Sequence, residues 1–263
     1  MIMEKNMTEQ NLAFPSKEIF EEKLYDIFKK NSLEKYLDED KADKFYRLAV
    51  ALVETNKSLN LTAVTDADGI ALKHFADSLI ATEEFPEGAT VIDVGCGGGF
   101  PTFPLAIVRP DLKITALDST EKKINFVAKT AIDLGLDNIN AISDRAESLG
   151  KGTLRESFDV ATARAVAALP VLTELCLPFV KVGGDFVAMK ALRADGEIDA
   201  TLSENLFEKL GGEKKPRVTP VTLVGGDEPL TRVVIKVKKI AKTPPSYPRN
   251  YSQIAKSAKK RTK

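Results

Sequence analysis

The stretch VIDVGCGGGFP, residues 91–101, joins a short apolar run to a glycine-rich segment, and it decides the fold class. The apolar run, residues 89–94, predicts a β-strand that is buried on both faces. Glycines directly after a first strand let the chain turn sharply and let a ligand approach the backbone. Because ligands of open α/β sheets bind beyond the carboxyl ends of the strands, this loop is the expected binding site.

The chain after this stretch alternates between strand and helix patterns. Further strands are expected from four apolar runs, at residues 113–117, 139–142, 158–163 and 185–190. A helix between the first two of these strands is expected to begin at Ser119 and to end at Gly135. This alternation predicts a doubly wound, mostly parallel sheet. Residues 217–224 and 231–240 predict two more strands without a helix between them, and hence an antiparallel hairpin at the sheet edge.

Three amphipathic helices precede the first strand. They are expected at residues 16–30, 39–57 and 65–82, where apolar side chains recur at helical spacing. Thr65 and Asp68 fit a capping box at the start of the third helix. The chain is therefore expected to divide into three parts: a helical N-terminal cap (residues 1–86), an α/β body (87–241) and a C-terminal tail (242–263).

The composition excludes several classes of protein. The chain has 263 residues, and 43% of them are hydrophobic, which is ordinary for a globular protein. Two cysteines cannot form a disulfide framework and favour a reducing cytosol. With a single histidine beside them, a His/Cys zinc site is not expected, and we expect no metal. No apolar run approaches the roughly 20 residues that span a bilayer, so we expect a cytoplasmic protein without membrane contact.

The zero net charge hides an asymmetry between the tail and the rest of the chain. Eleven of the 38 basic residues lie after Glu228, and no acidic residue follows Glu228. The preceding part therefore carries 27 basic and 38 acidic residues. A basic tail of this kind is typical of proteins that bind a polyanion such as RNA. A disordered, solubilising tail is the alternative.

The glycine loop and Asp118 together indicate a nucleoside-binding site. A dinucleotide fingerprint needs a third glycine, but Phe100 occupies that position, and no Walker lysine is present. Asp118 ends the second strand, at a spacing from Gly95 that suits a carboxylate bound to both ribose hydroxyls. Its alternative role is to cap the next helix. We therefore favour S-adenosylmethionine over NAD or ATP, since a sulfonium ligand brings no phosphate to cradle.

Several short motifs together resemble the RsmG family, also called GidB or glucose-inhibited division protein B. These are bacterial 16S ribosomal RNA guanine-N7 methyltransferases. The resemblance runs from about Leu37 to Ile240, and the combination of an upstream Asn-Leu-Thr and His-x-x-Asp-Ser with a methyltransferase loop is specific to it. The motifs that carry it lie at residues 60–62, 73–78, 93–104, 117–119, 145–147, 163–165 and 247–249.

The resemblance implies a class I methyltransferase with a mostly parallel seven-stranded sheet and a helical cap. It implies transfer of the methyl group of S-adenosylmethionine to N7 of one guanine, position 527, of 16S rRNA in the small ribosomal subunit. N7 has an exposed lone pair and no proton to lose, so the reaction needs no general base. Orientation can lower the barrier by up to ~7–11 kcal/mol. The partners expected are 16S rRNA, contacted in part by the basic tail, and a monomeric protein is expected.

The resemblance also assigns the cofactor contacts. Asp93 begins the motif, and the glycine loop lines the cofactor. Asp118 and Ser119 hold the ribose side. Ala146 and Glu147 flank the adenine, although Glu147 could equally be a carboxylate that stabilises the start of a helix. The members of the glycine loop are Gly95, Gly97, Gly99 and Phe100.

Four residues are candidates for catalysis or for holding the RNA. Arg164 follows the fourth strand, where methyl donor and target meet, so it is also assigned to the cofactor site. Its alternative role is a surface ion pair. Arg145 could grip RNA or cofactor, although the neighbouring Asp144 departs from the serine common in the family. Asn60 and His74 come from the cap, where they could contact the target base or only join the cap to the body.

Two other functions remain open from the sequence. One is a class I methyltransferase acting on a small molecule or a protein, which would not need the basic tail. The other is a non-catalytic rRNA-binding assembly protein with a vestigial cofactor pocket. The first should keep its activity without residues 242–263, and the second should bind rRNA but not the cofactor.

Overall fold

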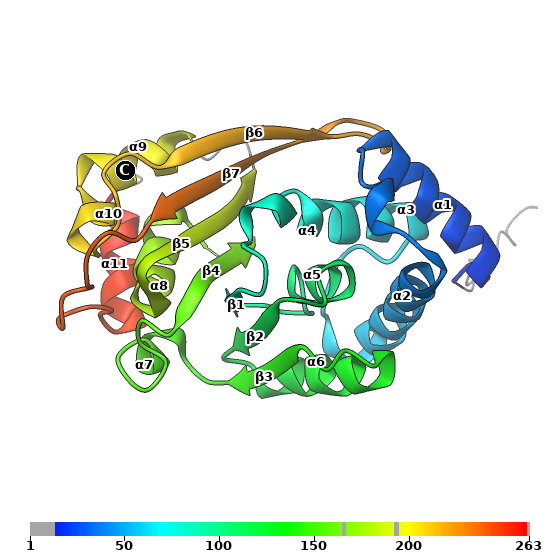
Figure 1. Cartoon of the computed structure of the whole chain (residues 1–263), viewed down its shortest axis with the longest axis horizontal. Coiled ribbons are helices and arrows are strands. Elements are labelled where there is room, and N and C mark those ends of the chain that lie inside the picture. Colours follow the sequence, from blue (N-terminus) through cyan, green and yellow to red (C-terminus); the bar gives the residue numbers. More distant parts are fainter. Residues whose placement is uncertain (1–13, 165–166, 192–194, 262–263) are drawn as a thin grey trace, which may run out of the picture.

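A seven-stranded sheet forms the centre of the molecule (Figure 1). The computed structural model describes residues 14–164, 167–191 and 195–261. The strand order is β3-β2-β1-β4-β5-β7-β6, and the five strands from β3 to β5 are parallel. The strands are β1 (Thr90–Val94), β2 (Lys113–Asp118), β3 (Ile139–Ser143), β4 (Phe158–Arg164), β5 (Val180–Ala191), β6 (Arg217–Leu223) and β7 (Leu230–Lys238).

The predicted doubly wound sheet and its edge hairpin are both confirmed. β7 pairs antiparallel with β5 on one side and with β6 on the other. β6 and β7 pair antiparallel because the connection between them is short, whereas parallel neighbours need a crossover of a dozen or more residues. The result is a parallel core sheet that ends in an antiparallel hairpin.

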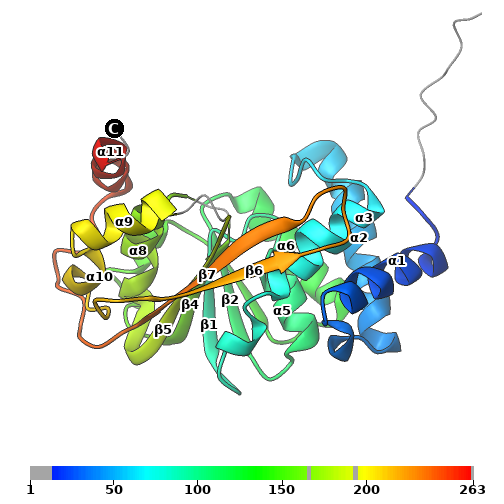
Figure 2. The same cartoon turned by 90° about the horizontal axis from the view of Figure 1, so that it is seen from above.

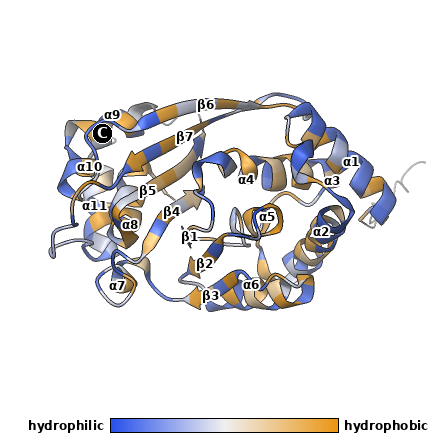
Figure 3. Ribbon diagram, in the orientation of Figure 1, coloured by the Kyte–Doolittle hydropathy of each residue, from blue (hydrophilic) through white to orange (hydrophobic). Residues whose placement is uncertain are grey.

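Helices cover both faces of the sheet. Val91 and Ile92 are both fully buried, and they belong to two separate hydrophobic clusters because successive side chains of a strand point to opposite faces. Figure 3 shows α5 and α8 as hydrophobic along most of their length, in keeping with their position against the sheet. The helices of the body are α5 (Thr102–Val108), α6 (Glu121–Leu134), α7 (Ala146–Leu149), α8 (Leu169–Cys176), α9 (Asp195–Ser203), α10 (Leu206–Lys209) and α11 (Tyr251–Arg261).

The cap lies at one end of the molecule, and α9, α10 and α11 lie at the other (Figure 2). The cap comprises α1 (Lys17–Lys30), α2 (Glu39–Leu59), α3 (Ala67–Gly69), a π-helical turn (Ile70–Ala76) and α4 (Asp77–Leu79). Short 3₁₀ turns lie at Glu34–Tyr36, Thr82–Glu84 and Leu177–Phe179.

The cap and the sheet share one hydrophobic cluster. Phe45 and Phe75 lie with their ring centroids 4.8 Å apart, and Phe75 lies 6.2 Å from Phe100 in the glycine loop. The same cluster reaches Val91 in β1. The cap is therefore packed directly against the glycine loop through hydrophobic side chains.

The predicted capping of two helices is wrong. The third cap helix begins after Asp66, not Thr65, because the Asp66 carboxylate accepts a hydrogen bond from the Gly69 backbone N–H at 2.7 Å. It is also not one continuous α-helix, since a π-helical turn interrupts it. Ser119 does not cap α6: Thr120 holds the N-cap position, without a side-chain hydrogen bond. Gly135 ends α6 in the left-handed conformation, as predicted.

A disordered tail is also wrong for the described part of the chain. Residues 251–261 form α11, and Ile254 in its first turns is 1% exposed. α11 packs on α8. Alternation of small and apolar residues with lysine gave α11 an amphipathic pattern, which the excess of positive charge obscured.

The tip of the β6–β7 hairpin is fastened to the cap. The side chain of Asn31, at the end of α1, accepts a hydrogen bond from Val224 N–H at 2.9 Å and donates one to the Val224 carbonyl at 2.8 Å. This pair of bonds joins the edge of the sheet to the first helix. None of the helices described is both long and apolar enough to cross a bilayer.

Candidate functional site

A cavity of about 160 Å³ lies beyond the carboxyl ends of β1, β2 and β3. This is the position at which ligands bind in open α/β sheets. Six of the residues assigned from the sequence line it: Gly95, Asp118, Ser119, Arg145, Ala146 and Glu147. The other lining residues are Val94, Leu117, Asp144, Leu175 and Tyr251.

The glycine loop wraps around the end of β2. Gly95 N–H and Cys96 N–H both donate to the Leu117 carbonyl, at 2.7 and 3.0 Å. Gly97 takes a φ of +56° and Gly99 a φ of +87°, a conformation that favours glycine. A Cβ on Gly99 would also meet the Phe103 ring at 2.2 Å. The loop therefore needs glycine for its own turn and for the close approach of the Phe103 ring.

Asp118 is fixed by the loop that it faces. One carboxylate oxygen accepts the Gly97 N–H at 3.0 Å, and the other accepts the Thr120 N–H at 2.8 Å. Each oxygen retains a lone pair, so the carboxylate can still accept hydrogen bonds from two hydroxyls. Asp118 does not hold the N-cap position of α6, which belongs to Thr120, but its carboxylate accepts the Thr120 N–H and lines the cavity.

The donor set of the cavity fits the nucleoside end of S-adenosylmethionine. Leu117 and Leu175 supply apolar walls, and Asp118 supplies the acceptor for a ribose. The cavity is smaller than the roughly 300–1,000 Å³ of sites for drug-sized ligands. A cavity of this size fits only part of the cofactor, and of the glycine loop only Gly95 lines it.

A second group of predicted residues gathers around Phe100, on the cap side of the loop. The His74 ring stacks on the Phe100 ring with centroids 4.7 Å apart, and the Arg164 guanidinium lies 5.5 Å from the same ring. The His74 Nε2 atom lies 2.7 Å from the Thr62 hydroxyl. Phe100 is 7% exposed and lies outside the residues lining the 160 Å³ cavity, so it supports the site from behind.

Buried polar atoms without a partner concentrate in this group. Within the described ranges, four buried side-chain atoms lack a hydrogen-bond partner, and three of them are His74 Nδ1, Asp93 Oδ1 and Arg164 Nε. Such atoms are rare in native proteins and call for a partner outside the protein or a functional role. These three atoms lie beside the glycine loop, where a ligand group could supply their missing hydrogen-bond partners.

Burial shifts the pKa of two of these groups in the direction that favours the uncharged form. Burial raises the pKa of Asp93 to about 7, even though Arg164 and a 2.6 Å hydrogen bond from the Thr102 hydroxyl favour the carboxylate. Burial lowers the pKa of His74 to about 3, and the charge of Arg164 adds to this. The imidazole is therefore neutral at physiological pH.

Arg164 joins the body to the cap. Its guanidinium donates to the Lys73 carbonyl at 2.8 Å and to Asp77 at 2.9 Å, and its side chain is 11% exposed. The other oxygen of Asp77 accepts from Arg232 Nε of β7 at 2.7 Å. The alternative of an ion pair is therefore present, but the pair is buried rather than at the surface.

The structure does not bring every predicted residue to one place. Asn60 ends α2 in a left-handed conformation with φ +48°, and its side chain is exposed. Among the cavity residues, the sequence analysis missed Leu175 of α8 and Tyr251 of α11. The Tyr-Pro-Arg motif at residues 247–249 contributed only to the family resemblance, and it did not predict the helix that follows it.

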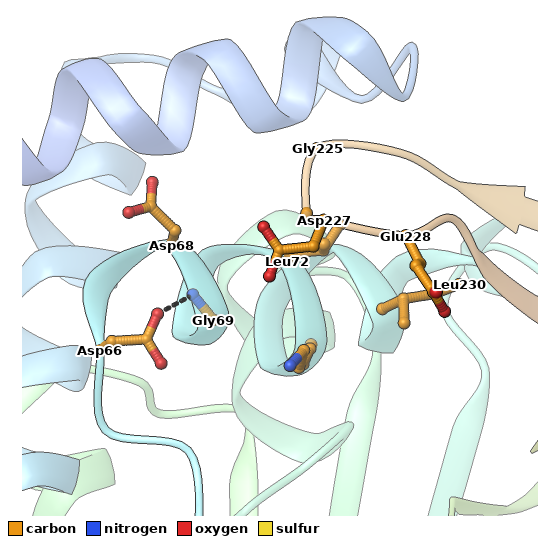
Figure 4. A pocket seen from close by; sticks show the side chains of 10 residues that line it. Asp66, Asp68, Gly69, Leu72, Gly225, Asp227, Glu228 and Leu230 are labelled. Atoms are coloured by element: carbon orange, nitrogen blue, oxygen red, sulfur yellow. Dashed lines mark hydrogen bonds between the residues drawn. The ribbon is translucent and has the colours of Figure 1, made fainter.

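A larger cavity, about 880 Å³, lies between the cap and the tip of the hairpin (Figure 4). Its polar lining is mainly acidic, with Asp66 and Asp68 from the cap and Asp227 and Glu228 from the hairpin, while Lys73 is its only basic member. An acidic wall disfavours RNA, and the cavity contains none of the residues assigned to the cofactor. Across the described ranges, no group of three or more His, Cys, Asp or Glu side chains is arranged to hold a metal.

The strand order, with β7 antiparallel between β5 and β6, and the cavity over β1 and β2 define a class I S-adenosylmethionine-dependent methyltransferase. A family model described as rRNA small subunit methyltransferase G, or GidB, matches residues 41–219. The chain belongs to this family.

Individual relatives agree with the family match. The ribosomal RNA small subunit methyltransferase G of Lactobacillus delbrueckii subsp. bulgaricus is 46% identical over 204 residues, 75% of this chain and 83% of that protein. The protein of the same name from Clostridium perfringens is 42% identical over 237 residues, 88% of this chain and 97% of that protein. Among solved structures, a SAM-dependent methyltransferase from Aquifex aeolicus is 20% identical, with a TM-score of 0.46, over 70% of this chain and 97% of that chain.

Proposed function

We propose that this protein transfers the methyl group of S-adenosylmethionine to N7 of a single guanine of 16S rRNA, the guanine at position 527. The observation that carries the proposal is the joint presence of the nucleoside cavity and of the cap motif, with His74 stacked on Phe100 of the cofactor loop. The relatives reported above are named for methylation of small-subunit rRNA.

The residues of this site orient and desolvate the reactants. The bound cofactor supplies an electrophilic methyl group, and N7 supplies its own lone pair. Asp118 orients the ribose side, and Glu147 flanks the adenine. No proton has to leave N7, so the neutral His74 and the fully buried Asp93 are not needed as bases. Near-attack positioning alone can contribute ~7–11 kcal/mol.

Arg145 and Arg164 take different parts in this proposal. Arg145 is exposed at the rim of the cavity, where its guanidinium can reach the RNA and favour O6 of guanine while N7 stays free. Arg164 is enclosed by Asp77 and Phe100, so it acts as a positioning residue that sets the cap against the loop. Asn60 is exposed at the end of α2, and this exposure leaves it free to contact the RNA.

The proposal includes the wider setting of the enzyme. Residues 1–86 serve as the cap, 87–241 as the methyltransferase domain and 242–263 as a basic tail that contacts RNA. The protein acts as a monomer in the cytoplasm on the small ribosomal subunit or on its rRNA.

The proposal is tested with methyl-labelled S-adenosylmethionine and small subunits that lack the modification. After digestion of the rRNA to nucleosides, the label is expected in 7-methylguanosine at one site. Absence of label from RNA, with cofactor binding confirmed, would favour a methyltransferase that acts on a small molecule or a protein. Binding of rRNA without any cofactor affinity would favour an assembly protein.

A further inference from the structure

Tyr251 lines the cofactor cavity although it lies well beyond the last strand of the sheet. It is the first residue of α11, and its side chain is 43% exposed. On the cavity wall it joins Leu175 of α8 and the pair Ala146–Glu147 at the start of α7. The cavity is therefore bounded in part by the C-terminal segment.

A buried ion pair fixes the start of α11 against α8. Glu174 has a fully buried side chain, and it accepts hydrogen bonds from Arg249 N–H at 2.8 Å, from Arg249 Nε at 2.8 Å and from Arg249 Nη2 at 2.6 Å. The remaining Arg249 Nη1 donates to Ser257 of α11 at 3.0 Å. A buried carboxylate with an arginine fork on both oxygens is a strong and directional contact.

A second arginine ties the same segment to α7. Arg155 donates to the carbonyls of Gly150, Thr243, Pro244 and Tyr247, at 2.5–3.1 Å. Gly150 directly follows α7, whose first residues, Ala146 and Glu147, line the cavity. The segment that leads to Tyr251 is thus held to both helices that border this part of the cavity.

The inner face of α11 is buried and fixes the position of the helix that carries Tyr251. Ile254 is 1% exposed and Ala258 is 8% exposed, and both belong to the hydrophobic cluster beneath α8. Tyr251 lies one turn before Ile254, so the burial of Ile254 sets its position on the helix. An aromatic ring fixed at a cavity of this size offers a flat apolar wall to a nucleobase.

We propose that Tyr251 contacts the adenine of the cofactor and that α11 is a cofactor-binding element of this enzyme. The inference rests on the proposed function, since it takes the 160 Å³ cavity as the site for the adenosine part of S-adenosylmethionine. The C-terminal segment then has a role at the cofactor in addition to its positive charge.

The test measures the Kd of S-adenosylhomocysteine by isothermal titration calorimetry. Tyr251→Ala is expected to weaken binding about tenfold, within the range that stacking of one base on an aromatic side chain produces. Tyr251→Phe keeps the ring and is expected to bind within about twofold of the wild type. Tyr25→Ala, which removes a comparably exposed tyrosine from α1 in the cap, serves as the matched control and is expected to leave Kd unchanged.

A fluorescence measurement separates direct contact from an effect through folding. The chain contains no tryptophan, so Tyr251→Trp places a single reporter at the cavity. Its emission is expected to change on addition of S-adenosylhomocysteine, whereas the emission of Tyr25→Trp is expected to stay constant. Unchanged Kd in Tyr251→Ala, or a silent Tyr251→Trp that still binds, would overturn the inference. A wild type that does not bind S-adenosylhomocysteine would instead overturn the proposed cofactor site.

Discussion

His74 is held neutral by its surroundings, and this couples stability to pH. Its pKa falls from 6.5 in the unfolded chain to about 3 in the folded protein, because burial and Arg164 oppose the imidazolium. Between these values the folded protein binds fewer protons than the unfolded chain, so the His74 contribution to stability rises with pH up to 6.5. Asp93 acts in the opposite direction, because its raised pKa favours the folded state at low pH and this contribution is lost toward pH 7.

The stability of His74→Gln, compared with the wild type, isolates the His74 contribution. As the pH is lowered below 6.5, the wild type is expected to lose about 1.4 kcal/mol per pH unit relative to the variant. Urea unfolding at pH 7.5, 6.5, 5.5 and 4.5, with each pH set to within about a tenth of a unit, measures the difference in the free energy of unfolding between the two proteins. A difference that does not change with pH would mean that His74 ionises normally in the folded protein.

Asp118 offers the cleanest single-residue test of the cofactor site. In Asp118→Asn, an amide group replaces one of two oxygens that accept backbone N–H bonds from Gly97 and Thr120, so two donors face each other. Hydrogen bonds to charged groups contribute ~1.5–3 kcal/mol, so the Kd of S-adenosylhomocysteine is expected to rise about ten- to a hundredfold. Calorimetry measures this, with Asp137→Asn, exposed just after α6, as the control. Equal affinity in the two variants would exclude Asp118 from the site.

Most residues that line the cavity could be predicted from the sequence because the cofactor motif lies within short stretches of the chain. Gly95 and Asp118 lie at strand ends, and the register of a parallel sheet brings such ends together. The position of Tyr251 was not predicted because it depends on a buried ion pair between Arg249 and Glu174, residues 75 positions apart. Nothing in the local pattern around Tyr251 specifies that long-range contact.

At the scale of elements, Asp77 connects β4, β7 and the cap. It accepts from both Arg164 and Arg232, and its side chain is 8% exposed. In Asp77→Asn the two guanidinium groups lose the charge between them. Since removal of one partner of a buried pair costs about 3–5 kcal/mol, the variant is expected to be destabilised by that amount.

Urea unfolding at neutral pH checks this expectation, with Asp26→Asn as the control. Asp26 pairs with Lys30 along the exposed face of α1, and such pairs contribute less than about 1 kcal/mol. If the two variants lost the same stability, Asp77 would not join these elements.

The elements that sequence analysis found are those with a strong repeating pattern. The long cap helices carry clear hydrophobic periodicity, and the parallel strands are short apolar runs. The π-helical turn at Ile70–Ala76 was missed because its apolar residues also fit an ordinary helix. The short helices α7 and α10 have four residues each, too few to show a period, and they form because tertiary contacts hold them.

At the scale of the whole molecule, the positive C-terminal segment is expected to set the salt dependence of RNA binding. Lys256 is exposed on α11, on the same helix as Tyr251. If Lys256 contacts one phosphate, Lys256→Gln is expected to reduce the slope of log K against log salt by about 0.7. Filter binding of small-subunit rRNA at several salt concentrations measures the slope.

Lys29→Gln is the matched control for this measurement. Lys29 is exposed near the end of α1, on the cap at the opposite end of the molecule from α11 (Figure 2). Its slope is expected to equal that of the wild type. Equal slopes for all three proteins would show that RNA does not reach α11 at Lys256.

The bonds between Asn31 and Val224 have a consequence for how the molecule opens. They link positions 193 residues apart in the chain, and they join the end of the first helix to the hairpin at the edge of the sheet. Together with the hydrophobic cluster common to the cap and β1, these bonds join the N-terminal helices to the sheet and to its edge hairpin. Amide hydrogens of α2 and of β1 should accordingly exchange with solvent deuterium at one common rate, as a single cooperative unit. Because the cap and the sheet share this cluster, we expect that removal of the cap would destabilise the sheet.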